Sequence, residues 1–253
     1  MTCRLMSNNM RLDVFLFENG YASSRTEAKQ LITESLVSVD GRVITKPSCD
    51  VDDGVKISIA DAGVRYASRG GLKLECAINA FEFEIRGKKA IDVGASSGGF
   101  TDCLLKNGAQ HVVAVDSGTD QLVSHLRNDA RVTVMEGYNA RYMSASDLPY
   151  KPQLAVMDVS FISATYIIPA LYDCLSEEAD FICLIKPQFE VGRANIGKGG
   201  IVKDDKVRAS AVKKVVDFAE SVGFKTISTV RSTVIGGDGN VEFLAHFKKQ
   251  QEA

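Results

Sequence analysis

The feature that most constrains the fold is a regular alternation of strand-like and helix-like segments from residue 89 onward. Short apolar runs rich in β-branched residues predict strands, amphipathic stretches predict helices, and the connections between them are short. Such a repeat folds into an α/β domain with a mostly parallel, doubly wound sheet. The strands are expected at 89–93, 111–116, 132–135, 153–158, 181–186, 225–231 and 241–247, and the helices at 100–107, 120–127, 164–174 and 205–222. The last two strands have no helix between them, which predicts an antiparallel pair at one edge of the sheet.

The first 60 residues follow a different pattern and predict a small α+β domain. Two short helical patterns occupy 11–34, and 37–44 reads as two strands joined by an Asp-Gly turn. A third short strand is expected at 55–59. The predicted division is 9–60 for the small domain, 61–67 for a linker and 68–253 for the α/β domain.

Composition places the chain among ordinary globular proteins. Its 253 residues are 45% hydrophobic and 25% charged, with a net charge of −2 at pH 7, which argues against fibrous, disordered and membrane-spanning classes. The longest apolar run, 181–185, has five residues, whereas a spanning helix needs about 20. The first residues carry no apolar stretch typical of a secretory signal, so we expect a cytoplasmic protein without a membrane partner.

The six cysteines and three histidines show no spacing typical of zinc ligands or of a disulfide framework. We therefore expect reduced, buried thiols and no metal site. A net charge near zero gives no general attraction to nucleic acid, so a prediction of RNA binding has to rest on local arrangement.

A glycine-rich loop after the first strand of the α/β domain points to a nucleoside cofactor. Gly94, Gly98 and Gly99 allow the chain to turn sharply and to approach a ligand at the carboxyl end of that strand. The next strand ends in Asp116, whose carboxylate can accept hydrogen bonds from two ribose hydroxyls. The loop starts at Asp92 and lacks the G-x-G-x-x-G spacing that binds a pyrophosphate, so S-adenosylmethionine suits it better than NAD.

Two further polar residues end strands of the same sheet. Asp158 and Lys186 close the strands 153–158 and 181–186, so both should lie at the carboxyl edge, where open α/β sheets bind ligands. The pattern alone places Lys73 and Glu242 less clearly. Solvated surface charges are the alternative for all four residues.

Motifs in both domains resemble those of the TlyA family, which is often labelled hemolysin A. The family joins an S4-type RNA-binding domain to an FtsJ-like ribosomal RNA methyltransferase domain. The matching segments are 11–13, 24–29 and 39–41 in the small domain, and 68–71, 92–102, 157–162, 185–190, 197–200 and 239–242 in the large one. The resemblance implies a Rossmann-like class I methyltransferase fold that is preceded in the chain by a small α+β RNA-binding domain.

The resemblance also implies a reaction. FtsJ-like enzymes use a Lys-Asp-Lys-Glu set to methylate ribose 2′-hydroxyls with S-adenosylmethionine, and TlyA members modify cytidines of small- and large-subunit ribosomal RNA. The corresponding residues are Lys73, Asp158, Lys186 and Glu242. The expected cofactor residues are Asp92, Gly94, Ser96, Gly98, Gly99, Phe100, Asp116, Asn139 and Asp158. Glu136 and Arg141 should lie beside the same pocket, and Asp120 stands where the family pattern has a glycine before Gln121.

The chemistry of the set suggests a division of roles. A ribose hydroxyl is a poor nucleophile until its proton is removed, and Lys186 in its neutral form is the expected general base. Asp158 is expected to orient Lys186 and the hydroxyl, and Glu242 to orient one of the lysines. Methyl transfer is an in-line displacement, so positioning should supply much of the acceleration.

RNA contact is expected from a local cluster of basic residues, because residues 1–60 contain seven Lys or Arg and eight Asp or Glu. Arg25 and Lys29 lie one helical turn apart and can share a face. The predicted RNA-binding residues are Arg11, Arg25, Lys29, Arg42, Lys46 and Arg69. The implied partner is ribosomal RNA or a ribosomal subunit, without an obligate protein partner. Lysines and glycines between 192 and 214 predict a second contact and a mobile loop over the site.

Other functions compete with this interpretation. An RNA-binding protein with an inactive methyltransferase domain is one, although the complete Lys-Asp-Lys-Glu set argues against decay. A cytolysin, as the older family label suggests, is another, although no spanning segment or strongly amphipathic basic helix supports a pore. A dehydrogenase is weaker still, because the dinucleotide fingerprint is missing.

Overall fold

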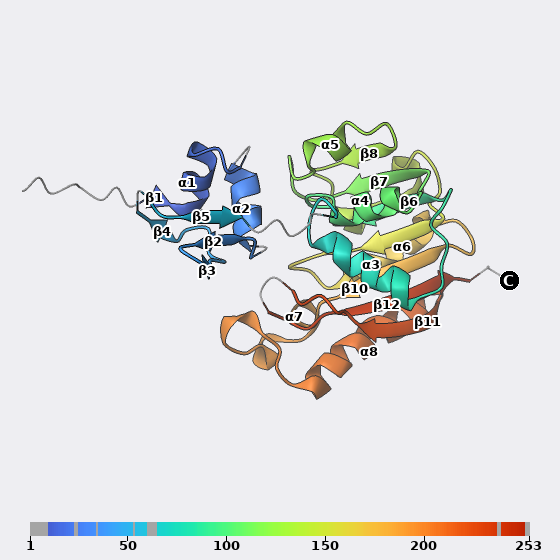
Figure 1. The fold of residues 1–253 in the computed structure, drawn as a ribbon. Helices are drawn as coiled ribbons and strands as arrows, with labels where there is room; N and C mark the ends of the chain where they lie inside the picture. The colour runs from blue at the N-terminus through green and yellow to red at the C-terminus, as the bar shows by residue number, and fades with distance from the viewer. Residues whose placement is uncertain are drawn as a thin grey trace, which may run out of the picture. The chain divides into compact units, whose positions relative to one another are not determined.

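The computed structural model describes residues 10–22, 25–33, 35–52, 54–59, 65–236 and 239–250 (Figure 1). The chain divides into two compact units, Met1–Val64 and Arg65–Ala253. The larger unit begins inside the segment expected as a linker. Tyr66 is buried there, and the backbone N–H of Ala67 donates to Oδ2 of Asp102 at 2.7 Å. The chain from Arg65 onward therefore packs as part of the larger unit.

The smaller unit combines two helices with short strands. Its elements are β1 (Met10–Arg11), α1 (Leu12–Glu18), α2 (Arg25–Thr33), β2 (Val37–Val39), β3 (Arg42–Val43), β4 (Asp50–Val51) and β5 (Ile57–Ile59). One sheet has the order β3-β2-β5, and β1 pairs with β4. Asp40 and Gly41 join β2 to β3 with φ of 49° and 79°, the positive values that a tight hairpin turn requires. The core centres on Leu12, Leu16, Ala28, Ile32 and Val37.

The larger unit is built on a seven-stranded sheet with the order β11-β12-β10-β9-β6-β7-β8. Its strands are β6 (Lys89–Val93), β7 (His111–Val115), β8 (Val132–Met135), β9 (Leu154–Met157), β10 (Asp180–Ile185), β11 (Phe224–Arg231) and β12 (Phe243–Lys249). The strands from β6 to β10 run parallel, whereas β12 is antiparallel to both of its neighbours, β10 and β11. The predicted doubly wound α/β fold with an antiparallel pair at one edge is confirmed.

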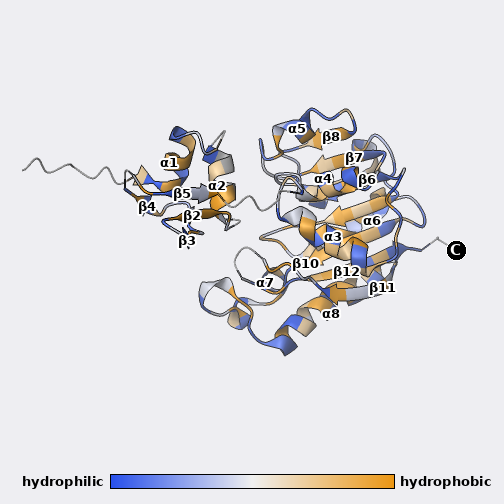
Figure 2. Cartoon of the chain, in the orientation of Figure 1, coloured by the Kyte–Doolittle hydropathy of each residue, from blue (hydrophilic) through white to orange (hydrophobic). Residues whose placement is uncertain are grey.

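Helices cover both faces of this sheet (Figure 1). On one face lie α3 (Gly70–Ala80), α4 (Gly99–Lys106) and α5 (Ser124–Arg127), and on the other lie α6 (Ile168–Cys174) and α8 (Asp205–Val222). Neighbouring strand residues alternate between the two cores: Ile91 belongs to the core under α6 and α8, and Ala90 to the core under α3 and α4. The central strands are accordingly apolar on both faces (Figure 2). None of the helices in the described ranges is long and apolar enough to cross a membrane.

The helices differ from the expectation at several points. The periodicity did not reveal α3 or the short α7 (Pro187–Glu190). Of the helix expected at 120–127, only α5 forms, because the backbone N–H groups of 120–122 bind the carboxylate of Glu136 instead. The helix expected at 164–174 is divided into a 3-10 turn, Ala164–Tyr166, and α6. Pro169 lies in the first turn of α6 and has no N–H with which to continue the preceding turn.

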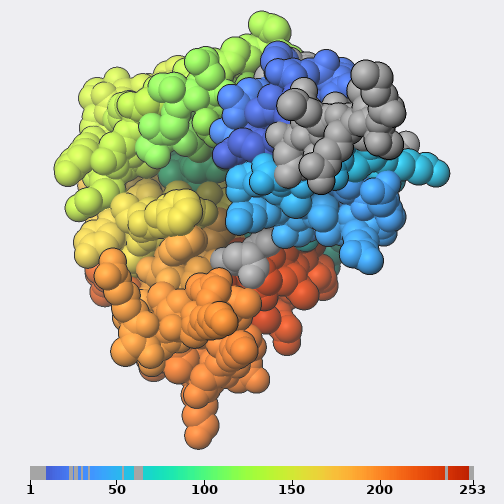
Figure 3. Space-filling view, turned by 90° about the vertical axis from the view of Figure 1, so that its left-hand side faces the viewer, coloured from blue at the N-terminus to red at the C-terminus, as the bar shows by residue number. Residues whose placement is uncertain are grey.

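The segment between α7 and α8 is mostly exposed and belongs to the orange part of the surface in Figure 3. It contains the 3-10 turns Arg193–Asn195 and Lys198–Gly200. The buried Asn240 fixes the part of this segment that precedes α8. Its Oδ1 accepts from the N–H of Val202 and its Nδ2 donates to the carbonyl of Gly200, both at 2.9 Å.

A buried carboxylate joins β10, β12 and the start of β6 at the amino edge of the sheet. Oδ1 of Asp180 lies 2.9 Å from Nε2 of His246, and Nζ of Lys88 donates to Oδ2 at 2.7 Å. Burial opposes ionisation of Asp180, but the contacts with His246 and Lys88 outweigh it and lower the pKa of this carboxyl group. A lowered folded-state pKa means that Asp180 stabilises the fold above its unfolded-state pKa, and that this stabilisation is lost as the pH falls through the folded-state value.

We expect Asp180→Ala to lower the free energy of unfolding of the larger unit by about 3 kcal/mol at pH 7, since it leaves the buried His246 and the partly buried Lys88 without their acceptor. Urea unfolding followed by circular dichroism measures the change, and the deficit should shrink in acid as Asp180 of the parent protein takes up a proton. Asp217→Ala is the matched control. Asp217 pairs with Lys213 on the exposed side of α8, and its loss should change stability by less than about 0.5 kcal/mol. Equal losses in the two variants would contradict the role given to Asp180.

Candidate active site

The loop after β6 brings two strand ends into close contact. Gly94 has φ of 85°, and a Cβ atom there would collide with the carbonyl group of Asp158. Glycine alone meets both the left-handed backbone and the close approach without strain. The glycine loop therefore lies directly against the carboxyl end of β9.

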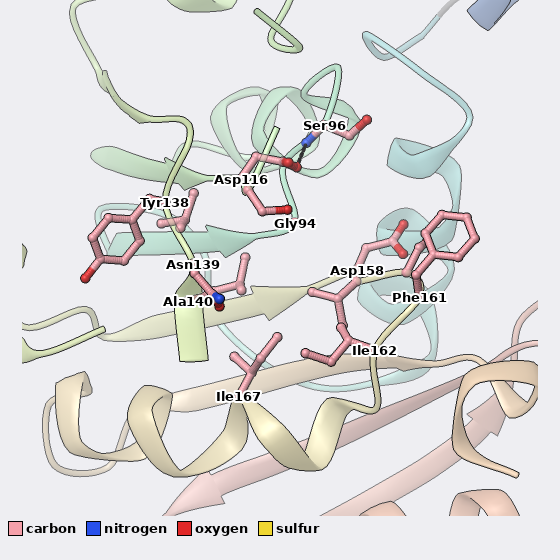
Figure 4. Close-up of a pocket in the computed structure, with 15 residues that line it drawn as sticks. Gly94, Ser96, Asp116, Tyr138, Asn139, Ala140, Asp158, Phe161, Ile162 and Ile167 are labelled. Carbon is pink, nitrogen blue, oxygen red and sulfur yellow. Dashed lines mark hydrogen bonds between the residues drawn. The ribbon is translucent and has the colours of Figure 1, made fainter. Parts of the chain in front are cut away.

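A pocket of about 360 Å³ opens at this edge of the sheet (Figure 4), within the range of about 300–1,000 Å³ typical of small-molecule sites. The predicted cofactor residues that line it are Gly94, Ser96, Asp116, Asn139 and Asp158. Apolar side chains complete the wall, among them those of Ile162 and Ile167. Polar groups on one side and an apolar wall on the other suit a nucleoside.

Asp116 is held at the pocket with acceptor capacity to spare. Its Oδ2 accepts from the N–H of Ser96 at 2.7 Å, the contact dashed in Figure 4, and its Oδ1 accepts from the N–H of Gly118 at 2.8 Å. An ionised carboxylate offers about four lone-pair sites. Two of them therefore remain for the hydroxyls of a ligand.

Other predicted cofactor residues face the interior of the domain and do not line the pocket. A Cβ atom on Gly98 would collide with Leu126, and one on Gly99 would collide with Ser68. Phe100 belongs to the core between α3 and α4 and is 3% exposed. These residues fix the shape of the loop through their contacts with the interior of the domain.

Asp92 also faces the interior of the domain. Its side chain is fully buried, and Oδ2 accepts from the hydroxyl of Thr101 at 2.7 Å. Burial raises the pKa of Asp92 to about 7. Although Asp92, Asp116 and Asp158 surround the loop, no group of three or more His, Cys, Asp or Glu side chains among the described residues is arranged to hold a metal ion.

Two lysine–carboxylate ion pairs lie at the same edge. Nζ of Lys186 is 2.6 Å from Oδ1 of Asp158, and Nζ of Lys73 is 2.6 Å from Oε2 of Glu242. The exposed side-chain fractions are 11% and 18% in the first pair and 11% and 3% in the second. Burial raises the pKa of Glu242, an effect that Lys73 and Lys186 oppose and Asp158 reinforces. The structure thus brings all four predicted residues within electrostatic reach of one another.

Each member of this set comes from a different element. Lys73 lies on α3, Asp158 follows β9, Lys186 follows β10, and Glu242 precedes β12. Ile185 faces Phe243 in the antiparallel register of β10 and β12. Their neighbours Lys186 and Glu242 therefore meet at the carboxyl edge of the parallel strands.

Sequence reasoning missed Ser160. Its hydroxyl accepts a hydrogen bond from Nζ of Lys186 at 2.7 Å, so the lysine contacts two residues of the loop that follows β9. The signal that could have found it is its place two positions after a carboxylate that ends a strand.

Comparison with protein families assigns both units. Residues 66–249 match the FtsJ-like methyltransferase model, and residues 10–57 match the S4 domain model. The chain is an FtsJ-like methyltransferase. The larger unit is its methyltransferase domain, and the smaller unit carries the S4 domain.

Relatives along nearly the whole chain confirm the resemblance to the TlyA family. The chain is 43% identical over 243 residues to the putative rRNA methyltransferase YqxC of Bacillus subtilis, covering 96% of this chain and 86% of that protein. It is 40% identical over 248 residues to the 16S/23S rRNA (cytidine-2′-O)-methyltransferase TlyA of Mycobacterium tuberculosis, with 98% and 92% covered. The chain belongs to this family.

Solved structures agree. A putative hemolysin from Streptococcus thermophilus superimposes with a TM-score of 0.77 at 42% identity, covering 98% of this chain and 90% of that one. A putative S-adenosylmethionine dependent methyltransferase from Listeria monocytogenes shares the fold, with a TM-score of 0.54 at 16% identity over 73% of this chain and 100% of that one.

Glu136 organises the methyltransferase loop that follows β7. Its carboxylate accepts from the N–H groups of Asp120, Gln121 and Leu122 and from Arg127. Partial burial opposes ionisation, but these hydrogen bonds outweigh it and lower the pKa of Glu136 to about 2. Asp120 has φ of 54°, a backbone region that favours glycine. The glycine expected from the family pattern before Gln121 thus has a conformational reason, and Asp120 adopts the left-handed backbone here.

Two arginines of the methyltransferase domain are held by neighbouring groups. The guanidinium of Arg141 lies 4.8 Å from the ring centroid of Tyr166, whereas Asn139 lines the pocket. Arg69 immediately precedes α3 and donates to the carbonyl of Ile235 at 3.2 Å.

In the smaller unit, Arg11 and Arg25 converge on one buried carboxylate. Nε of Arg11 lies 2.9 Å and Nη2 of Arg25 lies 3.2 Å from the oxygens of Asp13, which is fully buried. The hydrogen bond from Arg11 is the main cause that lowers the pKa of Asp13, against the effect of burial. The two arginine side chains are 47% and 52% exposed, so they keep N–H donors for a ligand. The other predicted RNA-binding residues of this unit, Lys29, Arg42 and Lys46, are exposed.

We expect Gly94→Ala to lower the free energy of unfolding more than Gly87→Ala. Both glycines have positive φ, 85° and 75°, but a Cβ atom has open space at Gly87 and collides with Asp158 at Gly94. The left-handed backbone alone should cost about 1 kcal/mol at either site, and overpacking at Gly94 about 1–3 kcal/mol more. Urea unfolding of the two variants measures the difference. Equal destabilisation would show that the strand ends do not depend on this close approach.

Proposed function

We propose that this protein transfers a methyl group from S-adenosylmethionine to the 2′-hydroxyl of a cytidine ribose in ribosomal RNA. The observation that carries the proposal is the position of two lysine–carboxylate pairs beside a pocket bounded by Asp116. The name of the M. tuberculosis relative supports the choice of base and RNA, since it is a 16S/23S rRNA (cytidine-2′-O)-methyltransferase.

The pocket fits S-adenosylmethionine, which would supply the methyl group from its sulfonium centre. The spare acceptor positions on Asp116 suit the two hydroxyls of the cofactor ribose. Ile162 and Ile167 offer apolar surface to an adenine ring. Asp92 and the packed glycines would contribute by fixing the shape of the loop.

Lys186 would receive the proton of the attacking hydroxyl. Its contacts with Asp158 and Ser160 fix the direction of Nζ. A lysine accepts a proton only in its neutral form, so Lys186 has to lose one before it activates the hydroxyl. S-adenosylmethionine in the pocket would supply the methyl group to the ribose oxygen, and Nζ of Lys186 would take up the hydroxyl proton.

Lys73 and Glu242 serve the same reaction by holding the substrate. Their ion pair is more deeply buried than that of Lys186 and Asp158. An ammonium fixed by a buried carboxylate is well placed to donate a hydrogen bond to the incoming ribose. This role keeps the hydroxyl in line with the transferred methyl group.

The S4 domain would hold the RNA. The Arg11, Asp13 and Arg25 cluster keeps exposed N–H donors, with Asp50 also near Arg11. With Lys29, Arg42 and Lys46, and with Arg69 on the methyltransferase domain, it would bind phosphates and position a structured RNA without reading its sequence. The partner would be ribosomal RNA or a ribosomal subunit in the cytoplasm.

We expect Lys186→Met to reduce methyl transfer by at least ~100-fold, as loss of a general base does, while the affinity for S-adenosylmethionine is unchanged. Transfer of labelled methyl groups to purified small and large ribosomal subunits, tested separately, measures the rate and names the substrate subunit. Lys151→Met is the control, because Lys151 is exposed just before β9, at the opposite edge of the sheet. Label on neither subunit with intact cofactor binding would favour an RNA-binding protein with an inactive methyltransferase domain.

Asp116→Ala should have the opposite effect to Lys186→Met: it should weaken cofactor binding and spare the transfer step. Removing a charged acceptor of two ribose hydroxyls should weaken S-adenosylmethionine binding by about 10- to 100-fold, and saturating cofactor should restore much of the transfer. Isothermal titration calorimetry of Asp116→Ala and Lys186→Met, side by side, makes each variant the control for the other. Unchanged affinity in Asp116→Ala would remove Asp116 from the cofactor site.

A further inference from the structure

A buried carboxylate outside the pocket connects the segments that carry Lys186 and Asp158. Glu190 is the last residue of α7, and its side chain is 2% exposed. Its Oε1 accepts from the N–H of Ala164 at 2.7 Å, and its Oε2 accepts from the hydroxyl of Ser163 at 2.5 Å. Lys214 of α8 donates to Oε2 at 3.1 Å and to the carbonyl of Glu190 at 3.0 Å. One side chain therefore joins α7, the loop after β9, and α8.

These contacts close a short ring of chain. Glu190 lies four residues after Lys186, and Ser163 lies five residues after Asp158. The Lys186–Asp158 pair closes the ring at one end at 2.6 Å, and the Glu190–Ser163 hydrogen bond closes it at the other at 2.5 Å. Pro187, directly after Lys186, fixes one backbone torsion within the ring. The chain between the Lys186–Asp158 pair and the Glu190–Ser163 hydrogen bond therefore has little conformational freedom.

Two further contacts run between the same segments. Nζ of Lys186 donates to Ser160, and the rings of Phe161 and Phe189 lie 5.2 Å apart between centroids. Phe161 has φ of 64°, which a bulky residue rarely adopts and which persists only where surrounding contacts enforce it. The loop after β9 is therefore held against its own preference, and it would relax if a restraint were removed.

We propose that Glu190 is a positioning residue that fixes Lys186 relative to Asp158 and Ser160. The proposal rests on the methyl-transfer function proposed above. Glu190 does not line the pocket, so it acts through the chain that it holds. A misplacement of about 1 Å can cost ~100-fold in rate. A carboxylate can hold an N–H, a hydroxyl and an ammonium in fixed directions at once, which an apolar side chain of similar size cannot.

The test is Glu190→Gln, which keeps the size of the side chain and removes its charge. We expect the single-turnover rate at saturating cofactor and RNA to fall about 10- to 100-fold, with the dissociation constants of both unchanged. Lys214→Gln should act in the same direction, more weakly. The control is Glu220→Gln, at an exposed position on the helix that carries Lys214. It should keep the parent rate.

Amide hydrogen exchange supplies a readout that does not depend on activity. In Glu190→Gln, exchange should accelerate at 159–164 and 187–190 and stay unchanged in the strands of the sheet. If Glu190→Gln does not fold, Ser163→Ala, which removes one contact, should show the same local pattern and the same selective loss of rate.

Three results would overturn the proposal: a parent-like rate in Glu190→Gln, a loss of cofactor affinity that accounts for the lost rate, or exchange unchanged at both segments. A parent protein that transfers no methyl group would overturn the proposed function, and the positioning role of Glu190 with it. An active parent with an equally active Glu190→Gln would overturn this inference alone.

Discussion

Two lysine–carboxylate ion pairs at the carboxyl edge of the sheet set the strictest requirement on the methyltransferase domain. The side chains of each pair are largely buried. Removing one partner from a buried pair costs about 3–5 kcal/mol, because the remaining charge is buried without a partner. The pairs therefore form only when α3 and the ends of β9, β10 and β12 lie next to one another. The glycine loop adds a condition of its own, since its approach to Asp158 leaves no room for a Cβ atom at Gly94. Cofactor pocket and charged set are adjacent because of that contact.

The direction of one strand decides whether this set can form. In a purely parallel sheet, a residue that precedes a strand lies at the amino edge, far from Asp158 and Lys186. Glu242 precedes β12, but β12 is antiparallel to β10 with Ile185 opposite Phe243, so its amino end lies at the carboxyl edge of the parallel strands. The insertion of β12 between β10 and β11 thus does more than close the sheet. It delivers the carboxylate that pairs with Lys73.

The same geometry explains what the sequence could and could not predict. Strand ends are visible in a hydrophobic pattern, so Asp158, Lys186 and Asp116 could be placed at one edge from periodicity alone. Lys73 and Glu242 could not, because α3 has no clear helical signal and no pattern reveals the direction of β12. The pattern placed them less clearly, and the family resemblance assigned them to the set. Of the expected cofactor residues, Gly94, Ser96, Asp116, Asn139 and Asp158 line the pocket, whereas Gly98, Gly99 and Phe100 pack against the interior of the domain. That distinction depends on where Leu126 and Ser68 lie, and such contacts between distant segments leave no trace in local sequence.

Charge arrangement in the smaller unit shows how little net composition says about binding. Residues 1–60 carry one more acidic than basic residue, yet Arg11 and Arg25 share the buried Asp13 and keep their outer halves exposed. A guanidinium has five N–H donors, and a single carboxylate cannot accept from all the donors of two guanidinium groups. In the methyltransferase domain, by contrast, each lysine of the charged set has its own carboxylate. The two arginines that share one carboxylate keep exposed N–H donors at the surface. The one-to-one pairs of the nearly dry site instead fix the positions of their lysines, and fixed positions are what an in-line methyl transfer requires.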